Sequence, residues 1–424
     1  MASADGRLSF RGIAPGAHVF ETVIGPCGLA WTARGIDLLV LPDGDLERTR
    51  AATLAAASRA LHEARPPHAR THAARPHRAQ PPGARSDDAR ALVARPPQPV
   101  RMLVRRLKAH LRGRADSFLD VPLDLARVGP FARRTYEELR RIPPGSVVTY
   151  GELARILEAP RARAPGARAI GRILGANPIP LLLPCHRVVG AKNALGGFSA
   201  AAGPGLKARL LFAEGVVLDP RHAQGIAALR KADPVLRRII DRVGPYPVSR
   251  GRSAASYETL LETIIYQQLS MKAAATIASR VRALTPGPGF PPPAEMAAIE
   301  PARLRAAGLS SQKLSYVKDL AARVVDRRLP LQRLARMDDD AVIAALTAVR
   351  GIGRWSAQMF LLFHLGRLDV LPTGDLGFRQ AVARGYGLEK ATEAELTRLG
   401  ERWRPYRSMA TWYLWQSLRL PAGE

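Results

Sequence analysis

The sequence predicts a multidomain protein in which an N-terminal α/β unit precedes an all-α unit. Its 424 residues exceed one ordinary core, because single domains commonly have roughly 100 to 200 residues. Short β-type runs broken by turn residues occupy residues 20–41, whereas helical apolar spacing continues from Pro220 almost to the C-terminus. We expect four segments: a small sheet (1–61), a disordered insertion (62–99), an α/β segment (100–219) and an all-α domain (220–424).

The charge of the chain favours nucleic acid as a partner. The formal net charge is +28, and arginine greatly outnumbers lysine. Each phosphate that such a protein neutralises releases counterions, which favours binding. A coding bias toward Arg and Ala would explain part of the same excess, so charge alone does not identify the partner.

The two cysteines, Cys27 and Cys185, are too few for several kinds of site. They exclude a disulfide framework, a four-cysteine zinc site and a cysteine-ligated iron–sulfur cluster. No run approaches the roughly 18 apolar residues that span a bilayer, and the first residues lack the pattern of a secretion signal. We therefore expect a cytoplasmic protein that makes no membrane contact and associates with the nucleoid when it binds DNA.

The insertion at residues 62–99 is rich in Pro, Arg, Ala and His and has almost no aromatic residues. It cannot bury enough apolar surface to order itself, and its irregularly spaced histidines favour a solvated loop over a metal site. Helical spacing resumes at residues 102–111 and 131–139, and a short strand is expected at 146–149. Residues 150–157 and 167–175 have the pattern of a helix-turn-helix pair.

One cysteine lies in a segment that suggests chemistry, NPIPLLLPCHRV at residues 177–188. Taken alone, Cys185 is typical of a small, inert core residue. His186 could accept the thiol proton if a carboxylate oriented its ring, and Glu214 lies downstream in an expected helix. These three residues predict a Cys-His-Glu relay, whereas Cys27, in a strand context, is expected to be structural.

This segment, followed by GGFS and KARLLFAEG, resembles the active-site region of O6-alkylguanine-DNA alkyltransferases. In that family the thiolate takes the alkyl group from guanine O6 by in-line displacement and keeps it, so each molecule acts once. The resemblance implies that Cys185 is the acceptor, that His186 and Glu214 are its relay through a water, and that Asn177 is an orienting hydrogen-bond partner. Some relatives bind zinc, but this chain lacks those ligands, so we expect no metal and no cofactor.

The same resemblance assigns roles to residues outside the cysteine segment. Tyr150, in TYGELA, would help to rotate the nucleotide, and Arg168 would fill the vacated stack, because base chemistry on a duplex requires extrusion. Without the resemblance, Tyr150 could cap a strand and Arg168 could be one more surface arginine. Phe198 and Ser199 would line the pocket, with Phe198 where many relatives carry tyrosine.

A glycine-containing hairpin is expected in the second half. An amphipathic stretch at residues 339–349 is followed by RGIGR and by a second apolar helix that begins at Trp355. Gly351 and Gly353 would allow a tight hairpin whose backbone N–H groups bind a DNA phosphate, with Arg354 beside them. Tight helical turns need glycine anyway, so the motif alone leaves both interpretations open.

The segment LPTGDLGF, about twenty residues further on, strengthens the DNA interpretation. Together with IIYQQLSMKAA at residues 264–274, it resembles the helix-hairpin-helix glycosylases, and within them the 3-methyladenine-DNA glycosylase II branch, over residues 232–418. Cleaving an N-glycosidic bond builds positive charge on the deoxyribose, which a carboxylate can stabilise. Asp375 is the expected carboxylate; the alternative is an ordinary helix N-cap.

The resemblance also implies a pocket and a mode of DNA contact. Alkylated purines carry a positive charge, so aromatic side chains can select them by cation–π stacking. The expected pocket residues are Trp355, Met359 and Trp415, with Trp412 as a further candidate that could equally belong to the core. Gln268 and Leu269 are expected to wedge into the vacated duplex. No lysine follows the hairpin, so we expect base excision without strand cleavage.

Taken together, the sequence predicts a DNA alkylation-repair protein. One half would transfer an O6-alkyl group irreversibly to Cys185, and the other would excise N-alkylated purines such as 3-methyladenine. The expected partner is double-stranded DNA that carries alkylated bases, and the expected state is a monomer. Two alternatives remain open, a catalytically silent sensor of alkylated DNA and a cysteine hydrolase.

Overall fold

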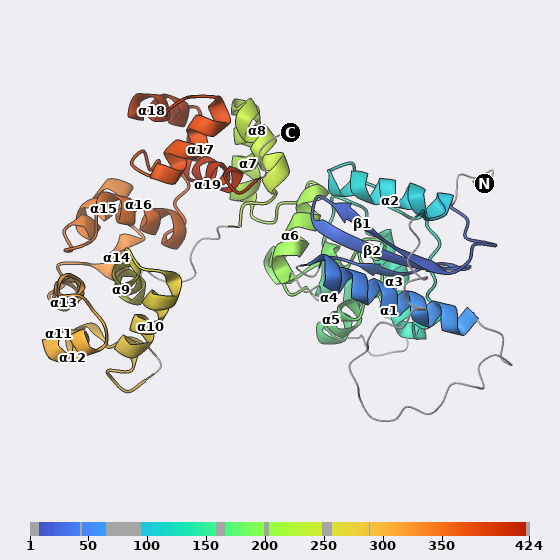
Figure 1. Ribbon diagram of the computed structural model, residues 1–424, viewed down its shortest axis with the longest axis horizontal. Helices are drawn as coiled ribbons and strands as arrows, with labels where there is room; N and C mark the ends of the chain where they lie inside the picture. Colours follow the sequence, from blue (N-terminus) through green and yellow to red (C-terminus); the bar gives the residue numbers. More distant parts are fainter. Residues whose placement is uncertain are drawn as a thin grey trace. The chain divides into compact units, whose positions relative to one another are not determined.

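The computed structural model describes residues 8–42, 45–64, 95–157, 166–198, 203–247, 257–287 and 289–420. The chain divides into two compact units, Met1–Ala223 and Gln224–Glu424 (Figure 1). Within the described ranges, none of the helices combines the length and the apolar character that crossing a membrane would require.

The first unit begins with the expected small antiparallel sheet. Strands β1 (Gly16–Thr22), β2 (Gly25–Thr32) and β3 (Gly35–Val40) pair in the order β1-β2-β3. Helices α1 (Leu46–Ala64) and α2 (Gln98–Leu111) lie on either side of the strands (Figure 1). The sequence did not predict α1, and α2 begins four residues earlier than predicted; both helices extend into the ends of the 62–99 segment. Residues 65–94 of that segment lie outside the described residues.

The rest of the first unit is mainly helical and brings the cysteine segment next to the helix pair. Strand β4 (Val148–Thr149) pairs in parallel with β5 (Val188–Val189), with Thr149 opposite Val189. Tyr150 follows β4 directly, and Cys185 lies just before β5, so this pairing brings the two residues into one region. The other elements are α3 (Pro130–Arg141), α4 (Tyr150–Ile156), α5 (Ala167–Gly175), η3 (Cys185–Arg187), η4 (Ala191–Asn193) and α6 (Gly203–Ala213).

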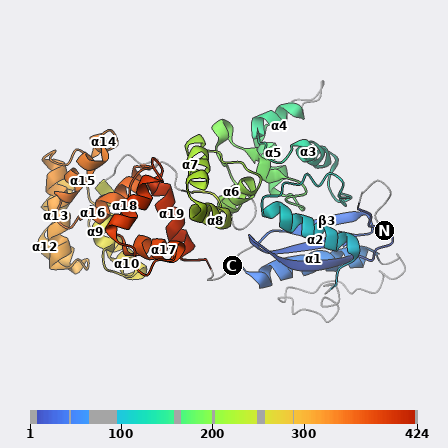
Figure 2. The same cartoon turned by 90° about the horizontal axis from the view of Figure 1, so that it is seen from above.

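The predicted helix-turn-helix pair corresponds to α4 and α5. A capping box between Thr149 and Glu152 fixes the start of α4. Most of the connection, residues 158–165, lies outside the described residues. Figure 2 shows α3, α4 and α5 grouped on one side of the first unit, away from its strands.

The described part of the second unit is all helical, as the sequence predicts. Hydrogen bonds join the beginning of this unit to its C-terminal part. Asp233, the N-cap of α8, accepts from Tyr386 and Trp403. The helices are α7 (Pro220–Ala232), α8 (Pro234–Val243), α9 (Tyr257–Tyr266), α10 (Met271–Arg282), α11 (Pro293–Ala298), α12 (Pro301–Ala306), α13 (Ser311–Val325), α14 (Leu331–Leu334), α15 (Asp339–Thr347), α16 (Arg354–Met359), the π-helical η5 (Phe360–His364), α17 (Leu376–Tyr386), α18 (Glu393–Glu401) and α19 (Arg407–Ser417).

The hairpin between α15 and α16 depends on one of its two glycines. Gly351 has a φ of +83°, and a Cβ atom there would lie 2.1 Å from Cδ2 of Tyr316. Only glycine fits that position, because both the backbone conformation and the aromatic ring exclude a side chain. Gly353 is the N-cap of α16 with a φ of −88°, and a Cβ atom there would meet nothing within 4 Å.

We predict that Gly351→Ala lowers the free energy of unfolding by about 2–4 kcal/mol, through left-handed strain and overpacking against Tyr316. The matched change Gly353→Ala should cost about 1 kcal/mol or less, because a Cβ atom meets no neighbour there. Urea unfolding of both variants measures the two values. Equal losses would show that the hairpin does not depend on Gly351.

Candidate active sites

Cys185 borders a cavity of about 340 Å³ in the first unit. The structure brings Cys185, Tyr150 and Phe198 together around this space, and Ser199 lies outside the described residues. Arg168 is exposed on α5, three residues before Gly171, so the two residues share a helix face near the cavity. The full lining is Tyr150, Gly171, Leu174, Gly175, Cys185, Gly197 and Phe198.

The loop that leads to Cys185 is braced by Asn177. Its side-chain Oδ1 accepts a hydrogen bond from the Ile179 N–H at 3.0 Å, and its Nδ2 donates to the Leu183 carbonyl at 2.8 Å. Within this loop the buried Leu181 has a φ of +71°, a conformation that costs a non-glycine residue roughly 1–2 kcal/mol. Asn177 therefore holds a strained loop in place and fixes the position of the sulfur.

The thiol of Cys185 needs a base before it can act as a nucleophile. Burial raises the pKa of the Cys185 thiol above its ordinary value, although a hydrogen bond with Asn177 and the charge of Lys207 oppose this shift. Lys207 Nζ donates to the Val188 carbonyl at 2.6 Å, and burial lowers the pKa of Lys207 to about 8. The resting form at neutral pH is therefore the protonated thiol, which is a weak nucleophile.

His186, the residue after Cys185, has the surroundings of a general base. Its Nε2 lies 2.9 Å from Oε1 of Glu214, and both side chains are buried. Burial lowers the pKa of His186 against the opposing influence of Glu214, so the ring is neutral at rest. The other ring nitrogen, Nδ1, has no hydrogen-bond partner among the described residues. A neutral imidazole with one nitrogen on a carboxylate and the other available can act as a general base.

Two residues that the sequence did not single out, His110 and Arg187, also contact Glu214. Arg187 donates to both oxygens, from Nη2 to Oε1 at 2.7 Å and from Nε to Oε2 at 2.9 Å. His110 Nε2 lies 3.1 Å from Oε1, and its Nδ1 accepts from the Asp116 N–H at 3.1 Å, which fixes the proton on Nε2. The signal for His110 was its place on the apolar face of α2, where a lone polar side chain needs a partner.

These partners keep a buried carboxylate ionised. Burial alone would raise the pKa of Glu214, but hydrogen bonds from His110, His186 and Arg187 hold it well below the ordinary 4.5. A carboxylate that stays negative stabilises the imidazolium that forms when His186 takes a proton.

In the second unit, Asp375 is held by two tryptophans. Trp355 Nε1 donates to Oδ2 at 2.7 Å, and Trp415 Nε1 donates to Oδ1 at 2.8 Å. Oδ1 also accepts from the Phe378 N–H at 2.6 Å, so Asp375 is the N-cap of α17 as well. Capping and chemistry were alternatives in the sequence, but here the cap and the two indoles orient the same carboxylate.

A second cavity, of about 640 Å³, lies beside the hairpin and is lined by two residues predicted to contact DNA, Gln268 and Gly351, and by one predicted pocket residue, Trp355. Gln267 Nε2 donates to the Gly351 carbonyl at 2.8 Å. Gln268 has a φ of +56°, and the next residue, Leu269, is 40% exposed. The loop after α9 thus presents an apolar side chain to solvent beside the hairpin, as a wedge requires.

The remaining predicted residues fall into different surroundings. Arg354 is exposed at the start of α16, and Met359 is half-buried at its end. Trp412 is half-buried and packs edge-on against Tyr246 and Tyr413, as a packing residue does. Among the described residues, no group of His, Cys, Asp and Glu side chains could hold a metal ion.

Sequence reasoning also missed Phe363. This side chain is 42% exposed and stacks on Trp415, with ring centroids 6.1 Å apart and planes 19° from parallel. It lies in the π-helical turn η5, a geometry that is rare and frequently found at functional sites. The α-helical spacing assumed from sequence does not predict that turn, so no signal placed Phe363 beside Trp415.

Comparison with known proteins finds two family models. Residues 130–216 match the 6-O-methylguanine DNA methyltransferase DNA-binding domain, and residues 261–405 match the HhH-GPD superfamily of base excision DNA repair proteins. DNA-3-methyladenine glycosylase 1 of Schizosaccharomyces pombe is 33% identical over 187 residues, which cover 43% of this chain and 82% of that protein.

The relatives that match the first unit include two of different names. A methylated-DNA–protein-cysteine methyltransferase of Metallosphaera sedula is 40% identical over 116 residues, which cover 27% of this chain and 68% of that protein. A DNA base-flipping protein of Thermus thermophilus is 40% identical over 111 residues, which cover 26% of this chain and 70% of that protein.

The low pKa of Glu214 predicts a loss of stability in acid. A group whose folded pKa lies below its unfolded value stabilises the fold fully above about pH 4.5, and this contribution disappears as the pH falls. Glu214→Gln should cost about 3–5 kcal/mol near neutral pH, because Arg187 keeps a buried charge without its counter-ion.

Urea titrations of the full chain between pH 7 and about pH 3, with proteolysis of first-unit peptides as the readout, measure this effect. The variant should show the flatter pH profile, and the difference between the two profiles isolates Glu214 from other carboxylates with lowered pKa values, such as Asp233. Parallel profiles would contradict the ionised state of Glu214.

Proposed function

The chain belongs to the methylated-DNA–protein-cysteine methyltransferase family in its first unit and to the DNA-3-methyladenine glycosylase family in its second, and from this we propose how its residues repair alkylated DNA. Both enzyme activities follow from the two memberships. The observation that carries the residue assignments is that each unit has one oriented reactive group. Cys185 lines a cavity in the first unit, and Asp375 in the second accepts a hydrogen bond from Trp355, which lines a cavity there.

In the first unit, Cys185 accepts the alkyl group of an O6-alkylguanine. The thiol proton passes to Nδ1 of His186, through a bridging water, and ionised Glu214 stabilises the imidazolium. The sulfur then forms a bond to the alkyl carbon as the bond from that carbon to O6 breaks. Guanine receives the electron pair and is protonated with the Tyr150 hydroxyl as donor. The thioether is stable, so the protein acts once.

Tyr150, Phe198 and Arg168 make room for the base. Tyr150 and Phe198 line the cavity with Cys185, and its volume of about 340 Å³ is within the range of small-ligand sites. Arg168, exposed on the same helix face as Gly171, fills the stack that the extruded guanine leaves. Asn177 keeps the sulfur beside the cavity by bracing the strained loop.

In the second unit, Asp375 supports hydrolysis of the N-glycosidic bond. An N-alkylated purine leaves as its bond to the sugar breaks, water adds to the sugar carbon, and the carboxylate stabilises the positive charge that develops between these events. Trp355, Met359, Phe363 and Trp415 form the aromatic and apolar surroundings that favour a cationic base. Gln268 and Leu269 fill the gap in the duplex, and the backbone at Gly351 and Gly353 with Arg354 holds a phosphate.

The remaining parts of the proposal concern the partner, the oligomeric state, the cellular location and the need for a cofactor. The partner is double-stranded DNA that carries alkylated bases, and the protein acts on it as a monomer in the cytoplasm, without a cofactor. The high net charge of +28 supports a polyanionic partner.

One paired experiment tests both active residues. With an O6-methylguanine duplex, the Cys185 peptide should gain the mass of one methyl group in the wild type and in Asp375→Asn, but not in Cys185→Ser. With methylated DNA, 3-methyladenine should be released by the wild type and by Cys185→Ser, but at least about 100-fold more slowly by Asp375→Asn. Each variant is the control for the other, and any crossed result would remove the corresponding residue from its role.

A second candidate is supported by the similarity to a DNA base-flipping protein. In this interpretation the first unit extrudes alkylated bases and signals their presence without removing the alkyl group. Cysteine at position 185 favours transfer, since a silent sensor has no use for a thiol there. The absence of any adduct on wild-type Cys185, with binding to the damaged duplex retained, would favour the sensor.

The indole hydrogen bonds of the second unit lead to a further prediction. Trp415→Phe keeps an aromatic ring against Phe363 but removes the N–H that orients Asp375, so release of 3-methyladenine should slow about 10-fold. Trp412→Phe is the matched control on the same helix, because Trp412 contacts Tyr246 instead, and it should change the rate less than about 2-fold. Single-turnover release assays distinguish the two. Equal effects would mean that α19 contributes only packing.

A further inference from the structure

Helix α2 carries a row of cations along one exposed face. Arg101, Arg105, Lys108 and Arg112 follow a spacing of four, three and four residues, which places them on the same side of the helix. Arg105, Lys108 and Arg112, together with Arg114 in the following turn, line a surface hollow of about 400 Å³. We call Arg101, Arg105, Lys108, Arg112 and Arg114 the α2 basic groove.

Most cations of this groove have no acidic partner. None of the ion pairs among the described residues involves Arg105, Lys108, Arg112 or Arg114. Arg106 on the same helix differs, because it donates to both Asp116 and Asp120, with Nε 2.7 Å from Asp116 and Nη1 2.6 Å from Asp120. The charge of Arg106, beside the groove, is therefore neutralised by carboxylates, whereas the positive charges of the groove have no such acidic partner in the described part of the chain.

The helix dipole does not explain the row. Cations stabilise the last turn of a helix, which accounts for Lys108 and Arg112, but they destabilise the first turns. Arg101 is among the first four residues of α2, Arg105 lies near its middle, and no acidic residue occupies its first turn. Four like charges on one face also repel one another, so the arrangement is unfavourable for the isolated fold and favourable for a polyanion.

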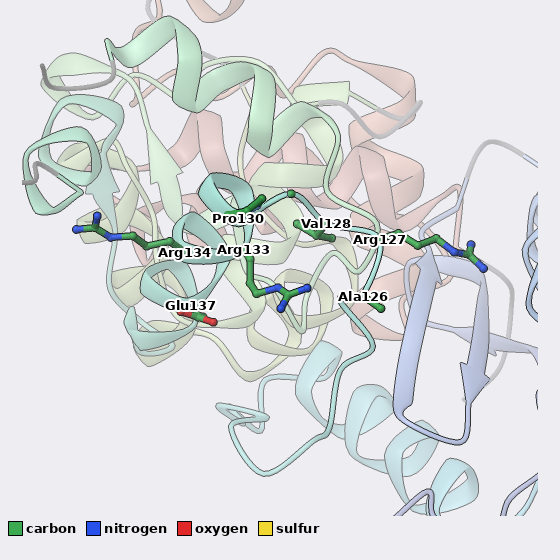
Figure 3. A pocket seen from close by; sticks show the side chains of 8 residues that line it. Ala126, Arg127, Val128, Pro130, Arg133, Arg134 and Glu137 are labelled. Atoms are coloured by element: carbon green, nitrogen blue, oxygen red, sulfur yellow. The ribbon is translucent and has the colours of Figure 1, made fainter. Parts of the chain in front are cut away.

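Another arginine-rich hollow of the first unit lacks these properties. The space of about 520 Å³ at the start of α3 is lined by Arg127, Arg133 and Arg134, but Figure 3 shows these three side chains pointing in different directions. Arg133 donates to the Leu125 carbonyl at 2.8 Å, and the carboxylate of Glu137 belongs to the same lining. Arginine content alone therefore does not produce a uniform, unpaired row.

We propose that the α2 basic groove is a second contact surface for the phosphate backbone of duplex DNA, separate from the Cys185 cavity. It shares no lining residue with that cavity. Figures 1 and 2 show α2 beside the strands, away from α4 and α5. The proposal rests on the proposed DNA-directed function of the chain.

The dimensions of the row fit a DNA strand. Eleven residues separate Arg101 from Arg112, which corresponds to about 16 Å along the helix axis. Over that length of the duplex axis, one strand of DNA presents about five phosphates, since the rise along the axis is roughly 3.4 Å per phosphate. Backbone contacts of this kind carry no sequence information, so the groove would hold undamaged DNA equally well while the active sites search for lesions.

The test compares two triple variants of the full chain on an undamaged DNA duplex. Arg105→Gln/Lys108→Gln/Arg112→Gln should lower the slope of log affinity against log salt concentration by about 2–3, since each lost phosphate contact removes about 0.9. The control, Arg11→Gln/Arg48→Gln/Arg50→Gln, removes the same formal charge from exposed arginines of the first unit. Two of these, Arg48 and Arg50, already pair with Asp45 and Glu47, so the slope should stay within about 1 of the wild type.

An unchanged slope in the groove variant would overturn the proposal, and so would an equal fall in the control, because the effect would then reflect net charge alone. Loss of binding to anionic phospholipid vesicles with an unchanged DNA slope would overturn it in favour of a membrane surface. Alkylation of Cys185 by free O6-benzylguanine should be equal in all three proteins. A lowered slope in the groove variant alone, together with a wild type that is not alkylated, would support the groove and refute the acceptor role of Cys185.

Discussion

In the proposed mechanism, the chemistry of the first unit depends on one carboxylate that is buried and still ionised. Glu214 accepts hydrogen bonds from His186, Arg187 and His110, which come from two separate parts of the chain. Burying a charge is costly unless hydrogen bonds and an opposite charge compensate for it, and here both are present. The same contacts that keep Glu214 ionised also fix the ring of His186, so the fold of the unit and the activation of Cys185 share one set of interactions.

In the second unit, neutral N–H groups rather than cations donate hydrogen bonds to the carboxylate. The proposed role of Asp375 requires a fixed orientation and a negative charge, and its carboxylate accepts from two indole N–H groups and one backbone N–H. No cation is paired with it among the described residues, which leaves its charge available to a positive centre on the sugar. Trp355 reaches from Asp375 to the cavity beside the hairpin, so it connects the carboxylate with the surface on which DNA is proposed to lie.

Local sequence patterns predicted much of this arrangement, and the exceptions have physical causes. The sheet, the helix pair around Tyr150 and the hairpin at Gly351 follow from periodicity and turn residues, which act over a few positions. His110 lies far from Glu214 in sequence, and only tertiary packing brings them together. Phe363 depends on a π-helical turn that residue spacing does not encode, and the α2 basic groove depends on which arginines lack an acid. Candidate residues in family motifs could be singled out from sequence, and one distant contact, between His186 and Glu214, was predicted with them; the contacts of His110 and Phe363 were not.

The central claim is that one chain holds two independent sites, of which one is consumed by its reaction and the other is not. It is tested most directly by a stoichiometric time course on DNA that contains both O6-methylguanine and 3-methyladenine in excess over protein. We expect loss of O6-methylguanine to stop at one equivalent per chain, while 3-methyladenine release continues through many turnovers after Cys185 is fully alkylated. Removal of O6-methylguanine beyond one equivalent, or base release that stops with the first reaction, would contradict this account.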